Sequence, residues 1–438
     1  MLSDRSGRRR FCGAFPRANR RAHGSRMERL TTTCAIAGGG PAGLMLGYLL
    51  ARAGIRVTVL ENHGDFLRDF RGDTIHPSTL RVMDRLGELD RFLALPHTRF
   101  RRMSLVFGEN PVPVVDLTTL GPETGFVAMM PQWDFLNYLT ERAGAYPGFT
   151  LRMRTRAEAL IEEGGRVTAL RAQGPEGPVE LRADLVVAAD GRSSELRVAS
   201  GLPRRDLSAP IDVLWMRVSR DPEESSDSLG RVGGGMILVM LNRGDYWQMA
   251  SVVPKGGFDE VRERGLEAFR ARLAAATGFS TERVAEIRDW DDVKLLSVQV
   301  NRLERWWRPG FLAIGDAAHA MSPVGGVGIN LAVQDAVAAA NLLAGPLRAG
   351  NLSDGDLAAV QRRRFWPTRL TQAAQVLAQD RVIRPQLDSD DPRPPLPLRL
   401  LARFPVLRRF PARFVGLGLR PELPVDAIVR PGQGDGAR

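Results

Sequence analysis

Short apolar runs alternate with longer amphipathic stretches along the first part of the chain, and this pattern predicts strands that alternate with helices. An apolar run begins at Cys34, a stretch rich in Ala and Leu follows it, and apolar positions then alternate with other residues over 57–61. A strand, a helix and a second strand in this order open a parallel sheet. Further apolar runs of strand length end at Asp190 and Gly315. We therefore expect an α/β fold with a Rossmann-like domain.

A different pattern lies between these runs and predicts a second, partly antiparallel sheet. Its strands are bounded by turn residues and cover residues 211–219, 236–241, 246–253 and 293–300. Residues 258–276 repeat apolar positions at helical spacing, so we expect one amphipathic helix over a face of this sheet.

The end of the chain changes character again. Residues 354–380 are helical by pattern, and residues 398–419 mix Arg with apolar side chains around Pro405 and Pro411. The two prolines break any long helix. We expect short helices that pack over the first domain, and peripheral contact with an anionic membrane is the less favoured interpretation.

Charge and cysteine content narrow the class of protein. The formal net charge is +11 and the chain has 61 Lys and Arg, but only Lys255 and Lys294 are lysines. This bias is typical of a GC-rich coding sequence, so it is weak evidence for a nucleic-acid partner. Cys12 and Cys34 offer no disulfide framework, and no apolar stretch approaches the length of a membrane span. We expect a cytoplasmic protein that binds no nucleic acid.

The first 26 residues have a composition of their own. They hold eight Arg and a single acid, Asp4, and Met27 follows them directly. They lack the apolar region of a secretion signal and any regular amphipathic stripe. We expect a disordered tail or a mis-assigned start, and the fold prediction leaves these residues out.

The first chemical motif follows the first predicted strand. Gly38, Gly40 and Gly43 form the pattern Gly-x-Gly-x-x-Gly, and Glu61 ends the next strand. Glycines at this spacing allow a tight turn, close approach of the backbone to a pyrophosphate, and close packing of the helix. The helix N-terminus offers free N–H groups to phosphates, and the acid can accept hydrogen bonds from a ribose. The motif therefore indicates a dinucleotide site.

Two further motifs end strands later in the chain. Asp190-Gly191 closes one apolar run, and Gly315-Asp316 closes another. An ionised Asp can accept hydrogen bonds from the sugar-alcohol chain of a flavin. Residues 328–330 then open a helix whose positive end would face the flavin ring and favour its anionic reduced form. Together the three motifs predict a protein that binds flavin adenine dinucleotide (FAD).

In this order the three motifs resemble those of the single-component flavoprotein aromatic hydroxylases, the p-hydroxybenzoate hydroxylase and ubiquinone-biosynthesis hydroxylase superfamily. The resemblance covers about residues 35–343 and implies a glutathione-reductase type FAD domain with an interleaved substrate domain. It assigns FAD contacts to Gly38, Gly40, Pro41, Ala42, Gly43, Glu61, Arg71, Gln132, Asp190, Asp316, Gly328, Ile329 and Asn330. In the family, the Asp-Gly motif also serves the nicotinamide donor, NADPH or NADH.

The resemblance divides the chain into discontinuous parts. The FAD-binding domain comprises residues 30–102, 131–201 and 293–344, and the substrate domain comprises residues 103–130 and 202–292. Residues 345–438 form a C-terminal helical segment. The motif order implies no separate nicotinamide domain.

Candidate substrate contacts come from the second sheet and from the third motif. Apolar side chains are typical of ligand pockets, and the candidates are Trp215, Met236, Trp247, Met249 and Pro323. Trp247 and Met249 share one face of a strand by alternation, although ordinary core packing explains each of these residues individually. His76 and His319 are the candidate acid-base residues, and His76 is the favoured one. The alternatives are a capping or surface role for His76 and local packing and hydrogen bonding for His319. We expect no metal site.

The resemblance implies a monooxygenase. Reduced FAD would add O2 at its C4a position, and the hydroperoxide would hydroxylate an aromatic, polyketide or quinone-like molecule. Three alternatives stay open: a halogenase, which needs a suitably placed lysine; a reductase or dehydrogenase of the same fold; and a flavin-bound sensor without turnover. A monomer and a homodimer are both compatible with the sequence.

Overall fold

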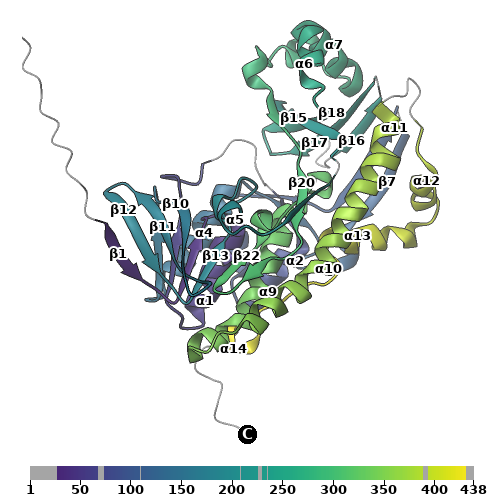
Figure 1. Ribbon diagram of the computed structural model, residues 1–438. Helices are drawn as coiled ribbons and strands as arrows, with labels where there is room; N and C mark the ends of the chain where they lie inside the picture. Colours follow the sequence, from purple (N-terminus) through teal and green to yellow (C-terminus); the bar gives the residue numbers. More distant parts are fainter. Residues whose placement is uncertain are drawn as a thin grey trace, which may run out of the picture.

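The computed structural model describes residues 27–67, 74–108, 110–207, 209–224, 229–233, 235–387 and 393–430. Its centre is a six-stranded sheet in the order β21-β22-β13-β2-β3-β9 (Figure 1). The strands are β2 (Cys34–Ala37), β3 (Val57–Leu60), β9 (Phe149–Arg152), β13 (Leu185–Ala188), β21 (Trp307–Arg308) and β22 (Phe311–Ala313). All pairings are parallel except that of the edge strand β21. The predicted α/β fold with a Rossmann-like domain is confirmed.

Helices cover this parallel sheet, and its strands are therefore apolar throughout. Every residue of β2, β3 and β13 is buried, as expected for strands that have both faces covered. Helix α1 (Pro41–Arg52) packs against α4 (Gln132–Gly144) and α9 (Gly328–Ala349). The shorter helices of this part are α2 (Pro77–Arg85), α3 (Leu89–Leu93) and α5 (Glu195–Ala199).

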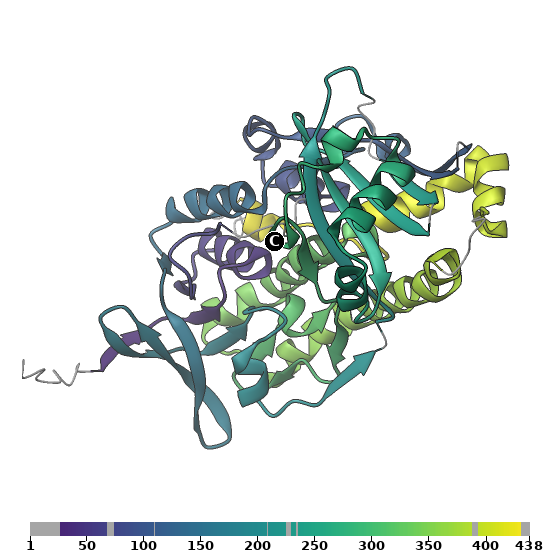
Figure 2. The same ribbon diagram turned by 90° about the horizontal axis from the view of Figure 1, so that it is seen from above.

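A four-stranded sheet stands beside the parallel sheet, at the left of Figure 1. Its order is β1 (Glu28–Thr31), β12 (Gly177–Arg182), β11 (Arg166–Gly174) and β10 (Arg156–Glu163). Figure 2 shows these strands projecting from the rest of the molecule. The sequence pattern did not predict this sheet.

The predicted second sheet has seven strands in the order β19-β15-β18-β17-β16-β6-β7. They are β6 (Arg102–Phe107), β7 (Asn110–Asp116), β15 (Ile211–Ser219), β16 (Leu229–Gly233), β17 (Met236–Asn242), β18 (Tyr246–Pro254) and β19 (Lys294–Leu296). Only the β16–β6 pairing is parallel, so the prediction of a partly antiparallel sheet is correct. Almost all of these residues fall within the predicted substrate domain, although the domain bounds themselves stay a prediction.

The helical cover of this sheet differs from the prediction of one helix over 258–276. The chain forms α6 (Phe258–Glu263) and α7 (Leu266–Thr277), followed by α8 (Thr281–Val284). Gly265 separates the first two with a φ of +88°, a conformation that favours glycine and ends a right-handed helix. Figure 1 shows α6 and α7 above the seven-stranded sheet.

Two three-stranded sheets join the larger ones. One contains β14 (Arg204–Leu207), β20 (Val300–Leu303) and β23 (His319–Ala320); the other contains β4 (Thr74–Ile75), β8 (Val127–Met129) and β5 (Thr98–Phe100). Single turns of 3-10 helix occur at η1 (Leu117–Leu120), η2 (Trp290–Asp292), η3 (Gly315–Ala317) and η4 (Val324–Gly326).

The C-terminal part is helical, as predicted. Helix α10 (Asp354–Ala378) runs beside α9 and continues into a π-helical turn, η5 (Gln379–Ile383), and α11 (Arg384–Leu387). Ser353 caps α10 in a reciprocal arrangement with Asp356. The later elements are α12 (Leu396–Arg403), η6 (Pro405–Arg408), α13 (Arg409–Gly416) and α14 (Asp426–Val429).

The position of the short helices corrects one prediction. Helices α12 and α13 pack mainly on β7 and η1, at the edge of the seven-stranded sheet, and not over the parallel sheet. Leu398 is buried against Phe107 and Val112 there. Apolar side chains of this edge strand, such as Val112 and Val115, explain the packing, because they need a cover that the rest of the sheet does not supply.

One helical stretch of the described residues, Val324–Ala349, is long and apolar enough to cross a membrane. In this structure 83% of its most apolar window is buried inside the protein. The stretch is therefore a core element between α1 and α10.

Candidate active site

The glycine motif forms a tight loop between β2 and α1, and each glycine has a distinct environment. Gly38 has a φ of +105°, and a Cβ atom on it would lie 2.3 Å from the carbonyl oxygen of Ala189. A Cβ on Gly43 would lie 1.9 Å from the carbonyl oxygen of Gly38. A Cβ on Gly40, by contrast, would meet no described atom within 4 Å. Gly38 and Gly43 thus serve close packing, while Gly40 faces open space.

The N-terminus of α1 opens onto the same space. Gly40 is its N-cap and Pro41 its first residue; no described side chain caps it, and its first turn contains no acid. The free N–H groups and the positive end of the helix dipole therefore remain available to an anion. Ala42 is buried behind this turn.

Glu61 lies directly beneath the glycine loop, at the end of β3. Its Oε2 accepts a hydrogen bond from the backbone N–H of Gly39 at 2.9 Å. Its Oε1 accepts from the backbone N–H of His63 at 2.9 Å and lies 2.7 Å from the imidazole Nδ1. The carboxylate that the motif places near a ribose is therefore hydrogen-bonded to the glycine loop itself.

The second motif joins the first at the carboxyl ends of the strands. The backbone N–H of Ala189 donates to Ala37 at 2.8 Å. Asp190 accepts from the backbone N–H groups of Glu195 and Leu196 at 3.1 and 3.4 Å through Oδ2. Its buried Oδ1 has no hydrogen-bond partner among the described residues, and burial raises the pKa of this carboxyl above its ordinary value. A ligand hydroxyl would satisfy the orphaned oxygen.

The third motif packs against the first. Gly315 has a φ of +59°, and a Cβ on it would lie 3.0 Å from the Cβ of Ala42. The backbone N–H of Ile314 donates to Ala188 at 3.0 Å, which aligns β22 with β13. The three sequence motifs, far apart in the chain, thus meet at one edge of the parallel sheet, the usual ligand position in open α/β sheets.

An ion pair connects the second and third motifs directly. The Nε of Arg192 donates to Oδ2 of Asp316 at 3.0 Å, and both side chains are part-exposed. Arg197 adds a hydrogen bond from Nη1 to the carbonyl of Ala317 at 3.3 Å. The sequence analysis did not single out Arg192. Its signal was a basic residue directly after Asp190-Gly191, in a motif predicted to face an anionic ligand.

The N-terminus of α9 is the second open helix end at this site. No described side chain caps it, and a Cβ on Gly328 would meet no described atom within 4 Å. Asn330 is buried, and its Oδ1 accepts from the backbone N–H of His76 at 3.0 Å and from Thr79 Oγ1 at 2.7 Å. Its side chain anchors the helix to α2, which leaves the backbone of residues 328–330 for a ligand.

The imidazole of His76 is buried, and it contacts the backbone of α13. It is 2% exposed, and its Nδ1 lies 2.8 Å from the carbonyl oxygen of Val415 in α13. Burial lowers the pKa of His76 to about 4, although hydrogen bonds of the imidazole with the backbone of Val415 and Gly326 act to raise it. The imidazole is therefore neutral at physiological pH. A catalytic role for His76 stays a prediction, and this geometry does not support it.

The structure gives less information on two predicted cofactor contacts, Gln132 and Arg71. Gln132 is the first residue of α4 and is half-buried, so its contact with FAD stays a prediction. Arg71 lies outside the described residues, as do residues 1–26 with their predicted disorder. Pro323 is the N-cap of η4, just before α9.

The structure places three of the predicted substrate contacts in the buried cluster on the helix-covered face of the seven-stranded sheet. Met236, Trp247 and Met249 are buried in one cluster with Phe269 and Leu273 of α7. Trp247 also donates from Nε1 to Oε2 of Glu224 at 2.7 Å. Their face of the sheet is the one covered by helices, so they are core residues. Alternation correctly predicted that Trp247 and Met249 share a face, but it does not say which face a helix covers.

Trp215 is the exception, because it lies on the opposite face of the sheet. It pairs with Ala250 of β18 and packs with Val298 and Val300. Val300 begins β20, which pairs with β23 at His319 and Ala320 of the third motif. This face is thus directed toward the cofactor motifs. The indole Nε1 of Trp215 is buried without a hydrogen-bond partner in the described part of the chain.

Comparison with known proteins shows a match to one protein family and to two named monooxygenases. Residues 31–374 match the FAD binding domain family. The chain is 35% identical over 355 residues to 6-methylpretetramide 4-monooxygenase of Streptomyces rimosus, covering 79% of this chain and 83% of that protein. It is 26% identical to para-nitrophenol 4-monooxygenase of a Pseudomonas species, covering 72% and 78% of the two chains.

A solved structure shows the same fold. The crystal structure of p-nitrophenol 4-monooxygenase from Pseudomonas putida superposes with a TM-score of 0.70 at 21% identity, covering 88% of this chain and 97% of that one.

Proposed function

Since the chain belongs to the FAD binding domain family of FAD-dependent aromatic monooxygenases, we propose that it hydroxylates an aromatic polyketide with NAD(P)H and O2. It is a flavin-dependent oxidoreductase, and FAD is its cofactor. The observation that carries the proposal is the meeting of Gly38, Asp190 and Gly315 at one sheet edge, between two open helix ends. The polyketide class rests on the relative named 6-methylpretetramide 4-monooxygenase.

The residues at this edge fit an FAD molecule. The open space at Gly40 and the uncapped end of α1 suit a pyrophosphate. Glu61 would accept from the adenosine ribose, and Asp316 from the ribityl chain. The backbone of residues 328–330 would lie beside the flavin ring, where the positive end of α9 stabilises negative charge. When bound there, FAD would supply the redox chemistry, namely hydride acceptance from the nicotinamide donor and activation of O2, with one oxygen atom going to the substrate and the other leaving as water.

The protein would position the substrate beside the cofactor and would exclude water from the site. The Trp215 face of the seven-stranded sheet is apolar and directed toward the cofactor motifs, so it is the surface proposed to hold an aromatic substrate. The indole Nε1 of Trp215 is a donor without a partner among the described residues. It would bind a carbonyl or hydroxyl oxygen of the substrate, which orients the ring.

A labelled-oxygen experiment tests this function. Purified FAD-loaded protein is mixed with NADPH or NADH and a panel of phenolic, polyketide and quinone compounds, and flavin reduction is followed by stopped flow. We expect slow reduction alone and much faster reduction with a substrate, because the substrate must favour the reducible arrangement over the resting one. In 18-O labelled O2, the product should carry one labelled oxygen atom.

Each other result would assign a different activity. A desaturated or reduced product without label would identify a dehydrogenase or reductase. FAD binding without any ligand-accelerated donor oxidation would favour a sensor.

A further inference from the structure

Asp335 is a fully buried carboxylate behind the third motif. It lies in α9 with no exposed surface, and its Oδ2 accepts a hydrogen bond from the backbone N–H of Gly315 at 3.1 Å. The same oxygen lies 2.5 Å from Nε2 of His319. One carboxylate oxygen therefore holds both ends of the segment that contains Asp316, the proposed ribityl ligand.

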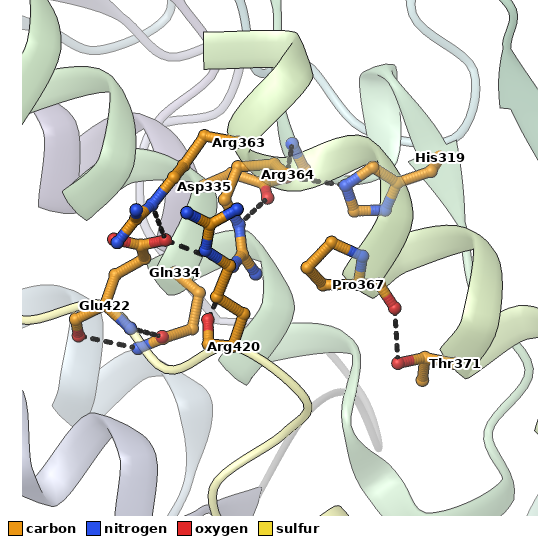
Figure 3. A network of polar contacts seen from close by, with 10 residues as sticks. His319, Gln334, Asp335, Arg363, Arg364, Pro367, Thr371, Arg420 and Glu422 are labelled. Atoms are coloured by element: carbon orange, nitrogen blue, oxygen red, sulfur yellow. Dashed lines mark hydrogen bonds and ion pairs between the residues drawn. The ribbon is translucent and has the colours of Figure 1, made fainter. Parts of the chain in front are cut away.

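The other carboxylate oxygen faces α10. Oδ1 of Asp335 accepts from Nε of Arg364 at 3.0 Å, and the guanidinium of Arg364 is also buried, at 1% exposure. Figure 3 shows Asp335 between His319 and Arg364. Burial alone would raise the pKa of Asp335, but the charges and hydrogen bonds of His319 and Arg364 hold it below its ordinary value. The ion pair is thus retained as a charged pair inside the protein.

Arg364, in α10, connects this pair to the last stretch of the described chain, residues 417–430, here called the C-terminal segment. Its Nη1 donates to the carbonyl of Arg420 at 2.9 Å and lies 3.6 Å from Oε1 of Glu422. Glu422 is itself 3% exposed and accepts two hydrogen bonds from Arg363, at 2.7 and 3.0 Å. Its backbone is bound on both sides by the side-chain amide of Gln334. Figure 3 shows these contacts around Glu422.

The far end of this connection, at Arg420 and Glu422, lies outside the part of the chain that the family model matches. The family match ends at residue 374, and Arg420 and Glu422 come more than forty residues later. Removing one partner of a buried pair leaves an uncompensated charge, which is strongly unfavourable. The position of Arg364 therefore depends on the C-terminal segment, and the position of Asp335 depends on Arg364.

We propose that the C-terminal segment at Arg420–Glu422 acts through Arg364 and Asp335 to position the Gly315–Asp316 turn for FAD. This inference rests on the proposed function, in which that turn binds the flavin. Asp335, Arg364 and Glu422 are then positioning residues, because none of them needs to touch the cofactor. The physical reason is that the Gly315 N–H has a fixed acceptor only while Asp335 is held by its cation.

The experiment measures FAD affinity in Asp335→Asn and Glu422→Gln. Apo-protein is prepared and titrated with FAD, and the Kd is compared with that of the unaltered chain. We expect the Kd to rise about ten-fold in Asp335→Asn and about three-fold in Glu422→Gln, within the range for residues that act through a network. In the double variant, the second change should add nothing, because both interrupt one path.

Two controls separate positioning from general loss of stability. Asp212 is also buried and accepts from a cation, Lys255, and from the backbone N–H groups of Gly256 and Val298. Asp212→Asn should lower the Tm as Asp335→Asn does, yet leave the FAD Kd unchanged. Asp426→Asn removes an exposed ion pair with Arg85 in the same C-terminal segment and should change neither quantity. The reduction potential and visible spectrum of bound FAD should shift only in the network variants.

The results of this experiment distinguish failure of the proposed function from failure of the positioning inference. If the unaltered chain fails to bind FAD, the proposed function is wrong. If it binds FAD and Glu422→Gln keeps the same Kd and spectrum, the positioning inference is overturned, whether or not Asp335→Asn folds. Additive effects in the double variant would also contradict the single path.

Discussion

The Nε of Arg192 lies 3.0 Å from Oδ2 of Asp316, although the two residues are 124 positions apart in the chain. This contact joins the Asp-Gly turn after β13 to the Gly-Asp turn after β22. The carboxylate that would bind the ribityl chain therefore already has a cationic neighbour. An ionised carboxylate is acceptor-only, which suits the hydroxyl donors of that chain.

Replacing Asp316 by Ala should weaken FAD binding. A hydrogen bond to a charged group contributes about 1.5 to 3 kcal/mol, which corresponds to roughly a ten- to a hundred-fold rise in Kd. The measurement is an FAD titration of folded apo-protein. Asp206→Asn is the matched control, because Asp206 pairs with Arg204 on an exposed strand. An unchanged Kd in Asp316→Ala would remove this residue from the cofactor site.

Gly40→Val should abolish FAD binding while the protein still folds. The added side chain meets no described atom near its Cβ, so it enters only the space proposed for the pyrophosphate. Circular dichroism and the Tm of the apo-protein check the fold, and flavin content after purification checks binding. Full flavin occupancy in this variant would place the pyrophosphate elsewhere.

Gly43→Ala, unlike Gly40→Val, should destabilise the fold. Its Cβ would lie 1.9 Å from the backbone oxygen of Gly38, so the helix must move away from the loop. We expect a loss of stability of about 2 kcal/mol or more, typical of overpacking against backbone. Urea unfolding of apo-protein measures it. A Tm equal to that of Gly40→Val would contradict the different roles assigned to the two glycines.

His76 should make stability depend on pH below neutrality. Its folded pKa of about 4 lies below its ordinary value of 6.5, so the unfolded chain binds more protons between these values. Stability therefore falls as pH decreases through this window, by about 2 kcal/mol between pH 7.5 and pH 5 from this group alone. Urea unfolding at both pH values, compared with His76→Gln, isolates the contribution. The variant should lose less stability on acidification, and equal losses would show that His76 titrates normally.

Substitutions of Trp215 and of Trp247 should affect different properties of the protein, the first substrate binding and the second stability. Trp215→Leu changes the face directed toward the cofactor motifs, so we expect a higher substrate KM with FAD affinity retained. Trp247→Leu removes a buried indole from the cluster with Phe269 and should destabilise the protein by about 3 kcal/mol. Steady-state kinetics and thermal unfolding of both variants separate the effects. A KM change confined to Trp247→Leu would restore the original pocket prediction.

Local patterns were sufficient to predict the loop and helix of the glycine motif at the edge of the parallel sheet. The turn at Gly38, the helix that follows it and the acid at Glu61 lie within one short stretch, and each has a strict backbone requirement. Such requirements can be read without knowledge of the tertiary fold. The strand ends at Asp190 and Gly315 are weaker signals alone, because a short apolar run also fits a buried helix, and their order after the glycine motif carried the prediction.

The substrate side and the support of the flavin loop depend on contacts between distant residues. The alternation around Trp247 is the same whichever face the helices cover, so sequence cannot distinguish core from pocket there. Asp335 is simply one polar residue in an apolar helix until Gly315, His319 and Arg364 are brought to it. Likewise, nothing local indicates that Leu398 covers the edge strand β7.

The last described helix, α14, packs against the first helix, α1. Arg52 at the end of α1 donates to the carbonyls of Ile428 and Val429 at 3.1 and 2.9 Å, and Ile428 is fully buried in the main core. During translation, α1 is made long before this partner leaves the ribosome. A chain that lacks α14 would leave the Arg52 guanidinium without these two carbonyl acceptors, and it would expose the part of the core that Ile428 covers.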